Sequence, residues 1–347
     1  MQMGFHKWIL LFLIIAVSES SFGQTDTLGN VINYRDKLTV GSFFSVRSYS
    51  LNYTPRVDGI LQSDLAESWS PNSRRVVGLS LIPGNIGLRI STSLPTSRED
   101  LTRYGQSDQF FLNLNLYGRK LLTETFFRYI NGFAVTNRPI QDTVNGTQVF
   151  PRKNIQMYHS EVNFLYFTNP DRYSYRASYY FNDRQLKPGG SISLQGKAYY
   201  YGLRTDSTFL NDEIDSTFFN ESNINRLNLY SVGFGVGYSY SYIFKEYFYL
   251  DGGLSIGPEV QLHEFRNTLD QYSSNQLKLQ MITDMRLSFG YNHENFYTGI
   301  IGTFDFWRMN LPRNLLTTNY FDISVHFGIR IDTPKSIKRI KKELRLD

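Results

Sequence analysis

The strongest constraint on the fold is an unbroken alternation of side chains between Tyr230 and Tyr242. Every second residue there is aromatic or valine, and the residues between them are all glycine or serine. Because successive side chains of a β-strand point to opposite faces, one face is apolar and the other is small and polar. The run exceeds the roughly 5–6 residues of an ordinary strand and suits the roughly 9–11 that a tilted strand needs to cross a bilayer. The segment therefore predicts a strand of a membrane barrel.

The same period of two recurs along the chain, at 248–262, 277–291 and 321–331 and more weakly at 86–91 and 112–116. The chain has 25 Tyr, 27 Phe and 26 Gly, yet its mean hydropathy is only −0.34. A barrel with lipid on one face and a polar lumen on the other has this low average. We therefore predict an all-β protein, a closed transmembrane antiparallel β-barrel of the bacterial outer membrane.

The N-terminus predicts export. An apolar run from Trp8 to Val17 follows Lys7 and leads into small residues that end at Gly23. This run is too short for a membrane anchor, which needs about 20 apolar residues. It is typical of a signal peptide, and we expect cleavage after Gly23. The expected division is a signal peptide at 1–23, a periplasmic segment at 24–37, the barrel at 38–332 and a periplasmic tail at 333–347.

The tail holds most of the positive charge. Residues 334–347 carry six basic and two acidic side chains, so little of the overall charge of +5 belongs to the barrel. This balance gives no basic field that would attract nucleic acid. The spacing of Ile337, Ile340 and Leu344 predicts a short basic amphipathic helix, which either contacts phospholipid headgroups or is simply solvated. Outer-membrane lipids and, during biogenesis, the outer-membrane insertion machinery are the expected partners.

The connections predict the topology. Tight turns are expected at 82–85, 118–120, 168–171, 245–246 and 292–295, and long polar loops at 54–72, 95–107, 137–153, 204–226, 264–275 and 309–319. In outer-membrane barrels the short turns are periplasmic and the long loops extracellular. If 172–203 crosses the membrane once, about 12 strands result, and both termini lie in the periplasm.

The stretch 172–203 is too long for one crossing. It looks like two strands, Tyr173–Phe181 and Ser191–Leu203, around a polar interruption at 182–190. Two crossings would give an odd number of strands, against the even number of single-chain bacterial barrels. We therefore expect 182–190 to fold into the lumen and narrow it, and a missed strand pair, giving 14 strands, is the alternative. The candidate constriction residues are Asp183, Arg184, Gln185 and Lys187 of this segment and Glu259, Asp284 and Arg286 of the wall.

The charges that should face the lumen are mixed in sign. They are Arg89, Arg128, Glu161, Arg176, Lys197, Asp251, Glu259, Lys278, Asp284, Arg286, Asp305 and Arg330. A ring of one sign would indicate ion selectivity, whereas mixed signs favour internal ion pairs. The lumen is then either plugged or a narrow pore.

No motif in the sequence identifies a reaction. Gly233, Gly235 and Gly237 precede no helix and so do not make a phosphate-binding loop. His159, His263 and His326 share the predicted inner face, but their spacing does not define a metal site. The neighbours His159, Ser160 and Glu161 could supply a hydrolase, although Ser160 should face away from the other two. We therefore expect no catalytic residues, no cofactor and no metal.

Several short stretches share a loose pattern, at 34–40, 70–72, 77–79, 86–88, 104–107, 117–120, 130–133 and 173–177, with Gln185 and 189–191. Together they resemble the domain-of-unknown-function family 4421, an uncharacterised outer-membrane family of the Bacteroidota. Lys187-Pro188-Gly189 departs from the pattern, where Lys-Ser-Ala is expected. The resemblance implies the outer membrane and no assigned activity.

Three functions remain open from the sequence. The first is a non-enzymatic barrel, either a narrow porin-like channel or a structural component of the envelope. The second is a lipid-modifying enzyme of the outer membrane. The third is an anchor for a secretion or surface complex, which would use the long loops or the tail.

Overall fold

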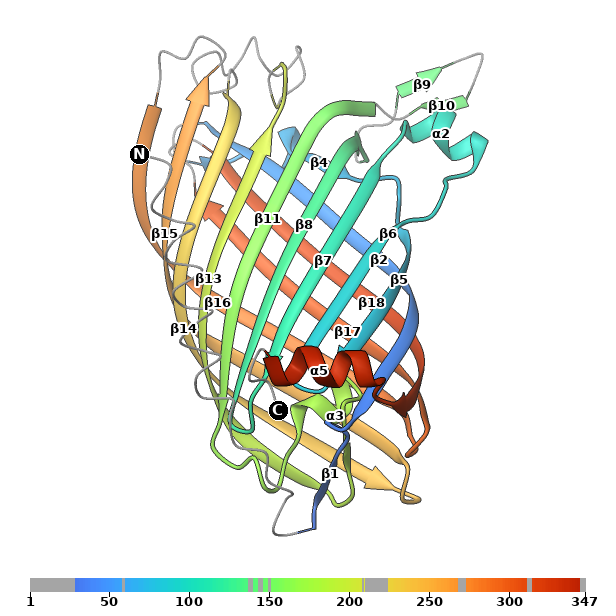
Figure 1. The fold of residues 1–347 in the computed structure, drawn as a ribbon. Coiled ribbons are helices and arrows are strands. Elements are labelled where there is room, and N and C mark those ends of the chain that lie inside the picture. The colour runs from blue at the N-terminus through green and yellow to red at the C-terminus, as the bar shows by residue number, and fades with distance from the viewer. Residues whose placement is uncertain are drawn as a thin grey trace.

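The computed structural model describes residues 29–57, 60–136, 140–142, 146–148, 151–207, 209, 224–267, 273–310 and 314–343. Twelve long antiparallel strands form the wall of a closed barrel (Figure 1). They are β2 (Lys37–Val57), β5 (Arg75–Pro83), β6 (Ile86–Ser93), β7 (Asp108–Tyr117), β8 (Leu121–Val135), β11 (Pro151–Phe167), β13 (Gly189–Arg204), β14 (Ile224–Phe244), β15 (Phe248–Asn267), β16 (Ser273–Asn292), β17 (Phe296–Asn310) and β18 (Asn314–Asp332). The prediction of about 12 strands is confirmed.

The barrel closes between its first and last strands. β2 pairs with β5 on one side and with β18 on the other, and every other wall strand pairs with its neighbours in the chain. The short β4 (Glu67–Ser70) joins β2 to β8 beyond the ends of β5, β6 and β7. Closure leaves no open sheet edge in the wall, as a strand protein in lipid requires.

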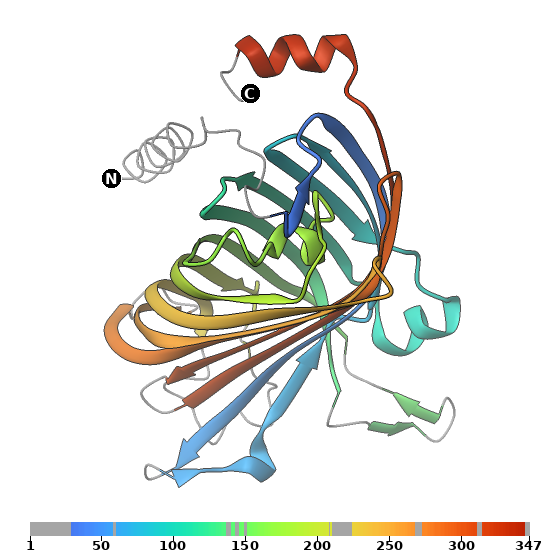
Figure 2. The ribbon, with the colours of Figure 1, turned by 90° about the horizontal axis from the view of Figure 1, so that it is seen from below.

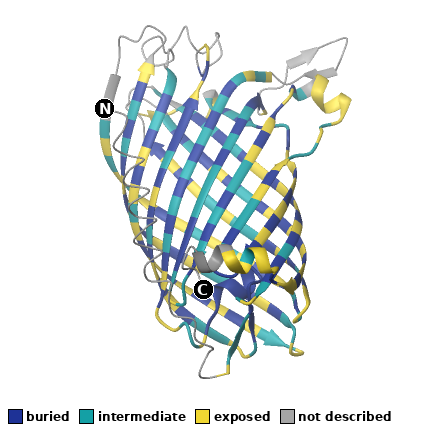
Figure 3. Cartoon of the chain, viewed as in Figure 1, coloured by how far each residue is buried: buried dark blue, intermediate teal, exposed yellow. Residues whose placement is uncertain are grey.

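Side chains alternate between the two faces of the wall (Figure 3). On β14, Phe234, Val236 and Tyr238 are 52%, 48% and 55% exposed, whereas Gly235 and Gly237 face inward and are buried. Large apolar side chains are exposed on the outer face of every wall strand between β13 and β18. This outer surface is what a barrel embedded in lipid presents, and it agrees with the predicted register of β14.

The two ends of the barrel differ. At the end that we call the turn end, tight connections of two or three residues join β5 to β6, β7 to β8, β14 to β15 and β16 to β17. The opposite loop end carries 3₁₀ helix η1 (Ser63–Leu65), α2 (Arg98–Tyr104) and the short strands β3 (Ile60–Leu61), β9 (Ile140–Asp142) and β10 (Gly146–Gln148). The prediction of long loops at 264–275 and 309–319 is wrong, because strands β15 to β18 continue through most of those polar residues.

The expected interruption exists, but it is longer than predicted. Residues 168–188, which we call the plug segment, connect β11 to β13 at the turn end and fold into the barrel mouth (Figure 2). Tyr173–Phe181 is not a strand. It contains the short helix α3 (Tyr175–Tyr179), and the following β12 (Asp183–Gln185) pairs with the N-terminal strand β1 (Val31–Asn33). Within 172–203 only β13 is a wall strand, so the number of wall strands stays even and the alternative of 14 strands is not needed.

The tail leaves the barrel at the turn end. Helix α5 (Lys335–Glu343) lies outside the ring of strands, with its axis across them (Figures 1 and 2). None of the helices in the described part of the chain is long and apolar enough to cross a membrane. The predicted signal peptide at 1–23 lies outside the described residues.

Candidate functional site

The plug segment is held mainly through its backbone. Arg330 on β18 donates from Nη2 and Nε to the carbonyl of Phe181, at 2.6 and 3.2 Å. Asn292 on β16 donates to the carbonyls of Ala177 and Asp183, at 3.0 and 2.9 Å. Side chains of the wall thus bind carbonyls of α3, of β12 and of the residues between them, as buried backbone requires.

Phe181 combines a strained backbone with a fully buried side chain. Its backbone lies in the left-handed region with φ of 58°, which is unfavourable for a bulky residue. Its ring is fully buried and stacks on Tyr297 of β17, with 4.1 Å between centroids. The wall contacts that hold its ring and carbonyl offset the strained backbone.

A second layer of the plug segment is bound by acidic and basic side chains. Arg286 on β16 forms two hydrogen bonds of 2.8 Å with Glu124 on β8, across the barrel. Glu124 also accepts hydrogen bonds from the hydroxyls of Tyr175 and Tyr180 in the plug segment. On the other side, Asp251 accepts from Ser178 at 2.9 Å. The plug segment is therefore fixed to wall strands that are not neighbours, β8 and β15.

Above the plug segment, ion pairs fill the middle of the lumen. Lys197 on β13 contacts Asp284 on β16 at 3.1 Å and Glu161 on β11 at 3.3 Å. Arg128 on β8 lies over the ring of Tyr320 on β18, 3.7 Å from its centroid. Glu161 lies on the strand next to Lys197, whereas Asp284 and Tyr320 are reached from strands that are not their neighbours. Charges of both signs therefore contact each other inside the lumen, as their predicted mixture favours.

Toward the loop end the lumen becomes aromatic and apolar. The hydroxyls of Tyr49 on β2 and Tyr201 on β13 are 2.8 Å apart, and these strands are separated by five others on either side of the ring. Both belong to a cluster of buried side chains that includes Trp69, Phe133 and Trp307. The bond between the two tyrosines therefore joins opposite sides of the barrel across the lumen.

The predicted constriction residues separate into two groups. Asp183 and Gln185 stabilise the plug segment internally, through Arg176 at 2.8 Å and the Ser174 amide at 2.8 Å. Arg184 reaches the rim, where it pairs with Glu246 at 3.2 Å, and Lys187 is exposed to solvent.

The wall residues also differ from expectation. Glu259 and Asp284 do not hold the segment 182–190, because Glu259 bonds to Ser231 at 2.7 Å and Asp284 to Lys197. Both lie nearer the middle of the barrel than the plug segment does. Arg286 does contact the plug segment, through Tyr175.

The weaker motifs take structural positions. A side-chain carbon added to Gly233 or Gly237 would come within 3 Å of neighbouring atoms, so these glycines provide space. His159 is fully buried among Phe126, Tyr199 and Trp307, and Ser160 lies on the opposite face of the strand. His159, Ser160 and Glu161 therefore do not assemble as a hydrolase triad. Among the described residues, no three His, Asp or Glu side chains are grouped to hold a metal ion.

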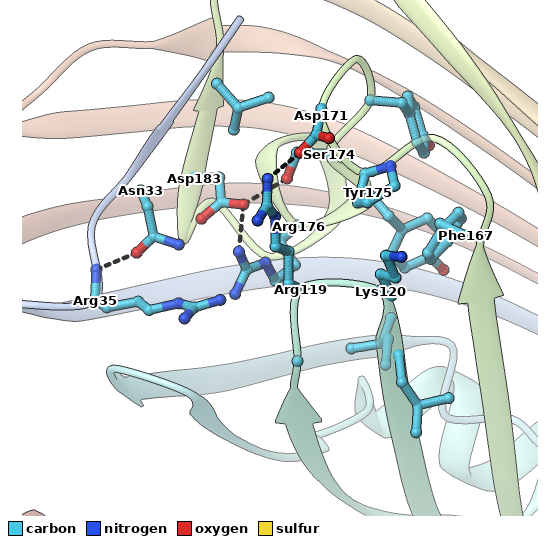
Figure 4. A pocket seen from close by; sticks show the side chains of 16 residues that line it. Asn33, Arg35, Arg119, Lys120, Phe167, Asp171, Ser174, Tyr175, Arg176 and Asp183 are labelled. Carbon is cyan, nitrogen blue, oxygen red and sulfur yellow. Dashed lines mark hydrogen bonds and ion pairs between the residues drawn. The ribbon is translucent and has the colours of Figure 1, made fainter. Parts of the chain in front are cut away.

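A small polar cavity opens at the turn end, beside the plug segment (Figure 4). It measures about 40 Å³ and lies between the N-terminal segment, the β7–β8 turn and the plug segment. Its charged lining is Arg35, Arg119, Lys120, Asp171, Arg176 and Asp183. Burial, followed by the nearby Arg176, lowers the pKa of Arg35 to about 10, so this guanidinium keeps its charge at neutral pH.

Sequence reasoning missed several of the residues that close the lumen. Glu124, Tyr49 and Tyr201 carry contacts across the barrel, and Arg35 lines the cavity. Their inward position followed from the alternation of their strands. The residues that they contact could not be predicted in this way, because those contacts depend on which strands face each other once the barrel has closed.

Comparisons with known structures return barrels of low similarity. The outer-membrane protease OmpT from Escherichia coli matches at 8% identity and a TM-score of 0.38, over 90% of this chain and 100% of that one. The translocator domain of the autotransporter NalP from Neisseria meningitidis matches at 9% identity and a TM-score of 0.39, over 92% and 95% of the two chains. The Pseudomonas putida toluene transporter TodX matches at 8% identity and a TM-score of 0.26, over 89% and 95%.

A comparison with curated proteins gave no match. The family model described as "Domain of unknown function (DUF4421)" matches residues 30–330, which run from the residue before β1 into the last turn-end residues of β18. This span contains the plug segment, the cross-lumen contacts and the whole lining of the turn-end cavity. The chain is an outer-membrane-type β-barrel and belongs to the DUF4421 family.

Proposed function

We propose that this protein is a closed, non-enzymatic barrel that serves as a structural component of the outer membrane rather than as a solute channel. The observation that carries the proposal is the bridging of the lumen at successive levels. Far sides of the ring are joined by Arg286 with Glu124 and by Tyr49 with Tyr201, and Lys197 joins β13 to β16 through Asp284. The plug segment adds a further barrier at the turn end.

The chemistry of these barriers supports a permanent closure. Removing one partner of a buried ion pair leaves an uncompensated charge, which is costly. The aromatic cluster would expose apolar surface if it opened. We therefore expect that the barrel does not conduct solutes in its resting state.

The proposal includes an orientation. The turn end, where β1 and α5 lie, faces the periplasm, because short turns are periplasmic in barrels of this class. Lys338 and Arg339 of α5 are exposed, and the helix axis runs across the strands and so along the membrane plane. These features support contact of α5 with the headgroups of the inner leaflet.

Liposome swelling tests the proposal. Purified protein reconstituted in liposomes should cause no swelling in an isotonic solution of a small sugar. A general porin at the same protein density is the control and should give rapid swelling. Sugar uptake through the wild-type chain would show an open lumen and overturn the proposal.

A deletion strain distinguishes a structural role from a role in uptake. Cells that lack the chain should become more sensitive to detergent, and the wild-type chain should restore resistance. Unchanged detergent resistance in the deletion strain would contradict a structural role in the envelope.

A further inference from the structure

The turn-end cavity gathers positive charge from three separate parts of the chain. Arg35 comes from the N-terminal segment after β1, Arg119 and Lys120 from the β7–β8 turn, and Arg176 from α3. Figure 4 shows the guanidinium groups of Arg35 and Arg176 directed toward each other. Like charges brought together in this way repel unless a negative group lies between them.

The acidic side chains of the cavity are already engaged. Asp171 pairs with Arg119, and Asp183 pairs with Arg176 at 2.8 Å and accepts a hydrogen bond from Ser174 at 2.6 Å. Four basic and two acidic side chains line the cavity. The lining therefore carries a net charge of +2 when all six groups are ionised.

Arg176 also has a donor without an acceptor. The residue is only 9% exposed and lines the cavity, and its Nη1 has no hydrogen-bond partner among the described residues. Buried donors are nearly always bonded, and a guanidinium binds planar or tetrahedral oxyanions through paired N–H groups. An oxyanion bound beside Arg176 in the cavity would supply an acceptor for this side chain.

We propose that the turn-end cavity binds a phosphoryl group, held by Arg35, Lys120 and Arg176. A phosphate monoester carries a charge of about −1.5 to −2 near neutral pH, which matches the surplus of the lining. Its oxygens point in several directions, as the basic groups around the cavity do, whereas a carboxylate presents two oxygens in one plane. The phosphoryl group comes either from a free phosphate compound or from a phospholipid headgroup beside the β7–β8 turn, whose phosphodiester carries one negative charge and so offsets only part of the surplus.

The size of the cavity fits this group. About 40 Å³ exceeds the roughly 10–15 Å³ that one water needs, but it leaves no room for a sugar or a peptide. Any larger part of the ligand must therefore lie outside, toward the solvent at the turn end. The proposal is independent of whether the lumen conducts.

Titration calorimetry in a neutral detergent tests the site, with inorganic phosphate as the probe. Wild-type protein should bind phosphate saturably, and the double variant Arg35→Gln with Lys120→Gln should bind at least tenfold more weakly. These two positions are chosen because Arg176 also stabilises the plug segment through Asp183. Lys187→Gln, an exposed residue of the plug segment that does not line the cavity, is the matched control and should bind as wild type.

A second arm identifies the source of the phosphoryl group. The protein is reconstituted in nanodiscs of phosphatidylcholine with or without phosphatidylglycerol, and phosphate binding is measured in each. Competition by phosphatidylglycerol assigns the site to a lipid headgroup, and its absence assigns the site to a free phosphate compound. Equal phosphate affinity of the double variant and Lys187→Gln would overturn the proposal, as would acetate that binds as tightly as phosphate or the absence of saturable binding in both arms.

Discussion

At the scale of single residues, the proposed closure depends on buried charged groups, each of which would be costly without its partner. Glu124 is 3% exposed and receives two hydrogen bonds from Arg286. Removing one partner of a buried pair typically costs about 3–5 kcal/mol, because the other charge stays buried without compensation. We therefore expect Arg286→Met to lower the free energy of unfolding by about this amount. The measurement is urea unfolding of the refolded protein in micelles.

Arg308→Met is the matched control for that measurement. Arg308 lies on β17 with its side chain exposed on the outer face, and it should change stability little. A loss below about 1 kcal/mol for Arg286→Met would mean that solvent reaches Glu124. The lumen around Glu124 would then be more open to water than the structure shows.

A second residue-scale prediction concerns the close approach of β14 and β15. A side-chain carbon on Gly257 would lie 1.9 Å from the carbonyl oxygen of Phe234, whereas one on Gly196 would meet nothing nearer than 3.9 Å. Backbone cannot yield as a flexible side chain can, so Gly257→Ala should destabilise the barrel by about 1–3 kcal/mol. Gly196→Ala should fold as wild type. Equal thermal unfolding temperatures for the two variants would show that the strands are farther apart at Gly257.

At the scale of elements, the sequence predicted the wall better than its contents. The alternation from Tyr230 to Tyr242 identified β14 and its two faces, because a strand between lipid and a lumen must keep a period of two. A similar pattern led to a wrong prediction of a strand at Tyr173–Phe181, where small or polar residues separate Tyr173, Tyr175 and Tyr179. There the carbonyls are bound by Arg330 and Asn292, which are distant in the sequence, and a short helix forms instead.

Loop lengths were overestimated for a related reason. The stretches 264–275 and 309–319 are polar and so resembled loops, yet their strands continue at the loop end. Polar residues are compatible with a strand that has passed beyond the lipid. The cavity residues Arg35 and Arg176 could not be paired from sequence, since only the β1–β12 pairing brings the N-terminal segment to α3.

At the scale of the whole molecule, the orientation in the membrane can be tested with single cysteines, because the natural chain has none. Glu99→Cys on α2 marks the loop end, and Glu246→Cys marks the β14–β15 turn. On intact cells an impermeant thiol reagent should label the first and not the second. Lysed cells should label both. The reverse pattern on intact cells would invert the barrel and would move the turn-end cavity to the cell surface.

The proposed closure places two barriers along the lumen, the plug segment at the turn end and the aromatic cluster near the loop end. Removing the plug segment alone leaves the bond between Tyr49 and Tyr201 and the aromatic cluster around it. Deleting Tyr173–Leu186 and bridging with Gly-Ser should therefore leave the barrel closed. Adding Tyr49→Ala and Tyr201→Ala to that deletion removes the barrier near the loop end and should produce channel openings.

Single-channel recording in planar bilayers tests the closed lumen most directly. The wild-type protein should show no current steps after insertion, and the deletion combined with the two alanine substitutions should show them under the same conditions. A heat-dependent shift in gel mobility confirms that each variant is folded before recording. Stable openings of the wild-type protein would contradict the closed barrel.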